Sequence, residues 1–76
     1  MNFKKEIELH LDNDEALYTA GEKLASLNDP TPEQYNDLAE AALDNLSDET
    51  GKQYNALDLR TALKVVKNWV KEEKIG

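Results

Sequence analysis

One short segment, Thr31-Pro32-Glu33-Gln34, constrains the fold of this chain more than any other. It combines a threonine suited to the N-cap, a proline at the first helical position and a glutamine placed to complete a capping box. The preceding Asn28-Asp29-Pro30 is typical of the end of an earlier helix. The short link predicts two antiparallel helices that pack as a hairpin on either side of it.

Apolar periodicity predicts three helices, over about residues 13–27, 32–46 and 55–74. Asp12 or Asn13 is expected to cap the first of them. Residues 47–52 are expected to form a polar loop, although the Asp and Glu after Ser47 could equally open a helix that tolerates Gly51. The predicted buried stripes are Leu17, Ala20, Leu24 and Leu27 in the first helix, Tyr35, Leu38, Ala39, Ala42, Leu43 and Leu46 in the second, and Leu59, Ala62, Leu63, Val66, Trp69 and Val70 in the third.

Gly21 lies inside the first helical pattern, where glycine costs about 1 kcal/mol relative to alanine. A close approach of another helix beside Ala20 would explain its presence, because a glycine leaves room where any other residue would place a Cβ atom. We therefore expect tight helix packing at this position.

The N-terminal segment, residues 1–11, fits two secondary structures. Ile7, Leu9 and Leu11 alternate with polar residues as in a strand, whereas Phe3, Ile7 and Leu11 share one face of a helix. The expected fold class is therefore mainly α: a small three-helix bundle with an N-terminal segment that is either a short strand or a fourth helix. We expect residues 1–76 to form a single domain.

Length and composition exclude several classes of protein. With 76 residues, no cysteine and a net charge of -7, the chain is too short for a two-domain enzyme and lacks the residues for disulfides or a cysteine-based zinc site. The negative charge disfavours direct binding to nucleic acid or to anionic membranes. No signal-peptide or membrane-spanning pattern interrupts the sequence, so a cytoplasmic location is expected.

Catalytic and metal-binding signatures are weak. His10 is the single histidine, so a two-histidine metal site cannot form within one chain. Asp12-Asn13-Asp14 lacks the glycine and the final glutamate of a calcium loop, since Lys23 stands at the twelfth position. Ser47 lies in Leu46-Ser47-Asp48, which departs from the Asp-Ser-Leu setting that the modified serine of an acyl carrier protein requires. We expect no enzymatic activity, no metal and no cofactor.

The charge layout is the most informative feature for function. Residues 12–50 contain one basic and eleven acidic side chains, whereas residues 51–76 contain six basic and three acidic ones. Within the predicted second helix, carboxylates recur with 4-3-4 spacing on the side opposite the apolar stripe. This column consists of Glu33, Asp37, Glu40 and Asp44.

Two interpretations of the acidic column remain open at this stage. It can be an ordinary solvated face that favours solubility, or a docking surface where negative potential attracts and orients a basic protein. A row of cations in the third helix has three interpretations: it can face the acidic helices within the fold, contact an acidic protein, or form a small nucleic-acid contact strip. The last is disfavoured, because the row lacks interleaved exposed aromatics and the chain lacks overall basicity. That row consists of Arg60, Lys64, Lys67, Lys71 and Lys74.

Tyr18 is displaced about 100° from Leu17 on a helix and is expected at the edge of the buried face. Leu57 and Val65 fall outside the apolar arc of their helix. These three residues are expected either to pack under the N-terminal segment or to form the seam of a homodimer.

The sequence thus favours a non-enzymatic module that binds a basic protein through Glu33, Asp37, Glu40, Asp44 and Tyr18, as an inhibitor, an antidote or a DNA-mimic antagonist. The alternative is a structural module that self-associates through residues 1–11 and the off-face apolar residues.

Overall fold

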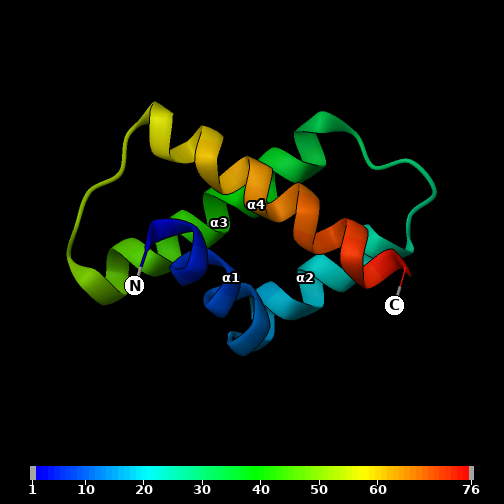
Figure 1. The fold of residues 1–76 in the computed structure, drawn as a ribbon, viewed down its shortest axis with the longest axis horizontal. Coiled ribbons are helices and arrows are strands. Elements are labelled where there is room, and N and C mark those ends of the chain that lie inside the picture. Colours follow the sequence, from blue (N-terminus) through cyan, green and yellow to red (C-terminus); the bar gives the residue numbers. More distant parts are fainter. Residues whose placement is uncertain (1, 76) are drawn as a thin grey trace.

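A computed structural model describes residues 2–75, with side chains to residue 73, and folds them into four helices (Figure 1). These are α1 (Phe3–Asn13), α2 (Glu15–Ser26), α3 (Pro32–Thr50) and α4 (Ala56–Ile75). No strand occurs within residues 2–75, so the expected mainly α bundle is confirmed.

The N-terminal segment forms the fourth helix, and the strand alternative is wrong. The Asn2 side chain caps α1 by accepting a hydrogen bond from the Lys5 N–H at 2.8 Å. Ile7 and Leu11 are both fully buried, as their four-residue spacing on one helix face allows. The Phe3 ring stacks on Tyr54, with 5.3 Å between ring centroids. A helix satisfies its own backbone hydrogen bonds, whereas a lone strand has no partner.

A single residue, Asp14, separates α1 from α2. Its N–H donates to the His10 carbonyl at the end of α1, and its side chain accepts from the Leu17 N–H at the start of α2. The expected caps, Asp12 and Asn13, instead lie in the last turn of α1. The predicted 13–27 helix therefore started too early, because the sequence offers several Asx caps in a row and only tertiary packing selects one.

The buried face of α2 differs from the predicted stripe. Leu17 and Leu24 are buried as expected, but Gly21 completes the face, while Ala20 and Leu27 are exposed. A Cβ atom at Gly21 would collide with the Trp69 ring of α4. The expected close approach of a helix is thus present, and it turns α2 so that the glycine faces inward.

α3 starts where the sequence predicted and ends later. The capping box is present: Thr31 Oγ1 accepts from the Gln34 N–H, and Gln34 Oε1 accepts from the Thr31 N–H at 2.8 Å. Instead of ending near Leu46, the helix continues to Thr50 and stops at Gly51, whose φ is 74°. The first part of the expected polar loop is therefore helical, because glycine readily adopts this left-handed C-terminal conformation.

α4 agrees with the predicted 55–74 helix to within one residue at each end, and it crosses α3 in Figure 1. All four helices contribute to one core. Val65 belongs to that core although its position lies outside the predicted arc, whereas Leu57 is 68% exposed. The fully or nearly buried apolar residues are Ile7, Leu11, Leu17, Leu24, Leu38, Ala39, Ala42, Leu43, Leu46, Ala62, Val65, Val66, Trp69 and Val70. Within the described chain, no helix has the combination of length and apolarity needed to cross a membrane.

Candidate functional site

The four carboxylates predicted from the sequence line the outer side of α3 and form what we call the acidic ridge. Glu33, Asp37, Glu40 and Asp44 are all exposed. The buried residues of the same helix, such as Leu38 and Ala42, lie on its opposite side. The capping box and the apolar stripe fix the rotation of α3, so the ridge follows from the same residues that build the core.

Among the described side chains, no carboxylate of the acidic ridge forms an ion pair. Elsewhere in those residues, Lys5 Nζ lies 3.7 Å from Glu8 Oε2 and His10 Nε2 lies 3.2 Å from Glu49 Oε2. Within the ridge, Glu40 Oε1 accepts a hydrogen bond from Asn36 Nδ2 at 3.2 Å. Like charges at three- and four-residue spacing repel one another, so the ridge is a region of concentrated negative potential.

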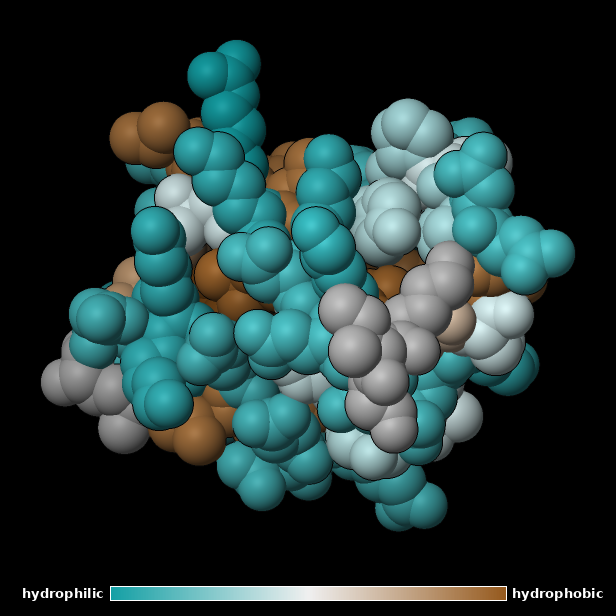
Figure 2. Space-filling model, turned by 45° about the vertical axis from the view of Figure 1, so that its right-hand side comes forward, coloured by the Kyte–Doolittle hydropathy of each residue, from teal (hydrophilic) through white to brown (hydrophobic). Residues whose placement is uncertain are grey.

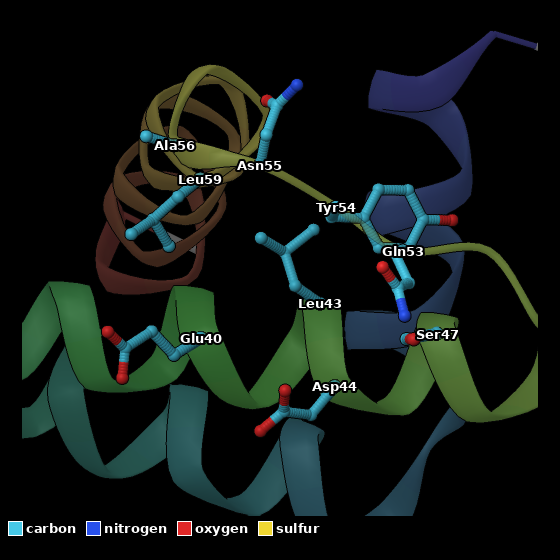
Figure 3. A pocket seen from close by; sticks show the side chains of 9 residues that line it. All are labelled: Glu40, Leu43, Asp44, Ser47, Gln53, Tyr54, Asn55, Ala56 and Leu59. Atoms are coloured by element: carbon cyan, nitrogen blue, oxygen red, sulfur yellow. The ribbon is translucent and has the colours of Figure 1, made fainter.

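A groove of about 470 Å³ lies on one flank of the ridge, where the start of α4 separates from α3 (Figure 3). Glu40 and Asp44 stand along its α3 side, while Leu43 and Leu59 point into the space between the two helices. We call it the α3–α4 groove. Its lining residues are Glu40, Leu43, Asp44, Ser47, Gln53, Tyr54, Asn55, Ala56 and Leu59.

A second groove of about 480 Å³ lies on the other flank, between the end of α2 and the start of α3. Asp37 is the ridge residue that lines it, and Lys23 of α2 lines it as well. Leu24, Leu27 and Leu38 supply apolar surface. The two flanks therefore differ in charge. Among the described lining residues, the charged ones of the α3–α4 groove are both acidic, whereas this α2–α3 groove has one charge of each sign.

The basic row of α4 is exposed but does not pair with the ridge. Arg60, Lys64, Lys67 and Lys71 all lie at the surface, and none joins an ion pair among the described side chains. Lys67 Nζ lies 6.0 Å from the centroid of the Tyr35 ring. The side chain of Lys74 lies outside the described residues. The interpretation that this row faces the acidic helices within the fold therefore lacks ion-pair support.

Hydrophilic residues cover most of the molecular face in Figure 2, and hydrophobic residues appear there in small separate patches. Among the described residues visible on that face, no broad apolar area stands out.

Tyr18 lies on α2 and does not line either flanking groove. Its ring meets Trp69 edge-on at 5.7 Å between centroids, and it is 37% exposed. The negative charge of Glu22, with a further contribution from Glu73, raises the pKa of the Tyr18 phenol. The expected position at the edge of the buried face is confirmed, whereas a role for Tyr18 in partner binding stays a prediction.

No group of three or more histidine, cysteine or acidic residues in the described chain is placed to hold a metal ion. The His10 imidazole contacts Glu49 and lines a surface hollow together with Glu6, Leu9 and Asn13. Among the described side chains, no serine, histidine and carboxylate are joined by the hydrogen bonds that a nucleophilic triad would use.

Comparison of the chain with protein-family models, with curated proteins and with solved structures finds no match.

Proposed function

We propose that this protein is a small binding module whose acidic ridge docks onto a basic surface of another protein. The observation that supports the proposal most directly is the absence of any ion pair to the ridge within the described residues. Four exposed carboxylates on one rigid helix attract a basic partner over several ångströms and restrict the orientation in which it docks.

The amount of charge on one helix face favours recognition over simple solubility. Lysines on the same solvated positions would remove the repulsion between neighbouring carboxylates, which costs a few tenths of a kcal/mol per pair. Yet α3 carries no lysine or arginine from Pro32 to Thr50. A binding role gives this pattern a use, because the repulsion is relieved when a cationic surface approaches.

We infer that such docking acts by occupying the partner, as an inhibitor, an antidote or a DNA-mimic antagonist. One helical face offers a charge about every 5 Å, compared with about 3.4 Å between phosphates along one DNA strand. Mimicry of nucleic acid would thus be approximate and would need neighbouring carboxylates such as Asp48 and Glu49, which are also exposed.

The test is a capture experiment from cell lysate at low and high salt with the natural protein and two variants. In the ridge variant, Glu33, Asp37, Glu40 and Asp44 become their amides. In the control variant, four exposed carboxylates elsewhere become amides: Glu8, Glu22, Asp29 and Glu72. Both variants have the same net charge of -3, compared with the natural -7.

We expect the natural protein and the control to capture the same basic protein, the ridge variant to lose it, and salt to release it. Circular dichroism establishes that each variant is folded. Equal capture by ridge and control variants would contradict the proposal, because total charge rather than the ridge would then be responsible.

The alternative function, self-association through the N-terminal segment, has less exposed surface to use. Ile7 and Leu11 are fully buried within one chain, and Val65 is buried as well. Of the residues considered for a homodimer seam, Tyr18 is 37% exposed and Leu57 is 68% exposed. Sedimentation of natural protein and Leu57→Ser tests it: a salt-resistant dimer that the substitution dissociates would favour this alternative.

A further inference from the structure

The two flanks of the acidic ridge are suited to different ligands. The α2–α3 groove contains the Lys23 ammonium, which repels a cation. Among the described residues that line the α3–α4 groove, the charged ones are Glu40 and Asp44. A cationic side chain from a partner is therefore favoured on the α4 flank of the ridge.

The α3–α4 groove is also partly apolar. Leu43 is almost buried and Leu59 half-buried, and both side chains point into the space between the helices (Figure 3). Ala56 adds a small residue at the start of α4. A lining in which two carboxylates lie beside two leucine side chains matches a side chain that has an aliphatic stem and a cationic end.

The positive end of the α4 helix dipole lies at its N-terminus and would repel a cation in the groove. This repulsion is weaker than at a helix N-terminus without an acidic residue. The Asn55 N–H donates to Asp58 Oδ2 at 3.0 Å, and the Asp58 N–H donates to Asn55 Oδ1 at 2.9 Å. The Asp58 carboxylate thus balances part of the positive end of the helix dipole.

We propose that the α3–α4 groove receives an arginine side chain from the basic partner, an inference that rests on the proposed function of the ridge. The guanidinium donates to the Glu40 and Asp44 carboxylates, and the methylene stem covers Leu43 and Leu59. Arginine fits better than lysine because its planar fork has five donors and is more weakly hydrated, so it can engage carboxylates with fixed geometry beside apolar surface.

The probe is a short peptide of alternating arginine and serine, compared with peptides of the same length in which every arginine is replaced by lysine or by neutral citrulline. Binding is measured by isothermal titration calorimetry over a salt series. Glu40→Gln/Asp44→Asn removes the charges of the groove. Glu33→Gln/Asp37→Asn removes the same charge from the same helix outside this groove, and Ala56→Phe fills the groove without changing charge.

We expect the natural protein to bind the arginine peptide more tightly than the lysine peptide and not to bind the citrulline peptide. Glu40→Gln/Asp44→Asn should weaken arginine binding roughly tenfold or more, as loss of charged hydrogen bonds does. The Glu33→Gln/Asp37→Asn control should weaken it less, and Ala56→Phe should weaken it while circular dichroism and the unfolding midpoint show a folded protein.

Several results would overturn the groove as an arginine site. Equal losses from the two double variants, or equal affinity for arginine and lysine, would mean that ridge charge acts without the groove, and the proposed function would stand. If the natural chain captures a basic protein from lysate but does not bind the arginine peptide, the arginine site is rejected and the proposed function of the ridge stands. A concentration-dependent dimer that Glu40→Gln/Asp44→Asn dissociates would assign the groove to a second copy, whose Arg60 is exposed.

Discussion

The two ends of α4 pack in opposite ways. Around Trp69 the helix lies so close to α2 that Gly21 is required, and the indole N–H donates to Asp12 Oδ1 of α1 at 2.8 Å. Around Ala56 the same helix separates from α3 and leaves the α3–α4 groove. One end therefore concentrates packing that holds three helices together, and the other leaves an accessible surface beside the acidic ridge.

The largest effect should come from truncating the tightly packed end. Trp69 is 6% exposed and contacts Tyr18, Gly21 and Asp12. Trp69→Ala should lower the free energy of unfolding by about 3–5 kcal/mol, because it leaves a large cavity in the core. Leu57→Ala, in the same helix but exposed, should change it by less than about 0.5 kcal/mol. Urea unfolding followed by circular dichroism measures both; similar losses would contradict the contrast.

Gly21→Ala should destabilise the fold by about 1–3 kcal/mol through overpacking. Helix propensity alone would stabilise this variant by about 1 kcal/mol, so the sign of the change is diagnostic. The new methyl group would collide with Trp69 Cζ3 and lie 3.0 Å from Cη2. The ring has little freedom to move away, because Asp12 and Tyr18 hold it.

The same Gly21 substitution in a variant with a smaller side chain at position 69 makes the test more specific. Trp69→Leu makes room at the α2–α4 contact, so adding Gly21→Ala there should cost far less than in the natural chain, or increase stability. A double-mutant cycle on unfolding midpoints measures this coupling. Independent, additive effects would show that the glycine is not needed for helix approach.

The contrast between the two ends of α4 also explains which features could be predicted from the sequence. The helix in α3 was predictable because Thr31 and Gln34 signal its start locally, and the ridge followed from residue spacing. The end of α3 was misplaced, although Gly51 offered a signal for the later stop. The α3–α4 groove depends on how far α4 separates from α3, which is a tertiary property that the pattern of one helix does not contain.

The same limit applies to the tight end of α4. The sequence suggested a close helix contact at Gly21, but it did not identify the contacting residue, because Trp69 lies 48 positions later. Likewise, Asp12 or Asn13 was expected to cap a helix, whereas in the structure Asp12 accepts the Trp69 hydrogen bond. Long-range pairs of this kind appear only once the helices are assembled.

Beside the α3–α4 groove, at the N-terminal end of α4, removing charge should stabilise rather than destabilise the protein. Glu40→Gln/Asp44→Asn relieves repulsion with Asp37 and between the two positions, so we expect the free energy of unfolding to rise by about 0.5 kcal/mol at low salt. High salt should erase the gain, because it screens exposed charges. Thermal unfolding in a salt series measures it. A loss of stability would instead indicate that these carboxylates maintain the shape of the groove.

The smallest effect should appear at high pH. It comes from Tyr18, which contacts Trp69 near the C-terminal end of α4. Its pKa in the folded protein is raised above the ordinary 10.0, chiefly by the Glu22 charge, so folding favours the protonated phenol. The contribution of Tyr18 to stability is therefore fully present below about pH 10 and declines as pH rises through the raised pKa. Tyr18→Phe keeps the ring beside Trp69 and removes this titration, so stability should fall less steeply in the variant above pH 10.

Urea midpoints across this range measure the two slopes, with Tyr35 and Tyr54 common to both proteins. Glu22→Gln should move the Tyr18 pKa back toward its ordinary value, and equal slopes in all three proteins would mean that the carboxylates around Trp69 do not influence the phenol.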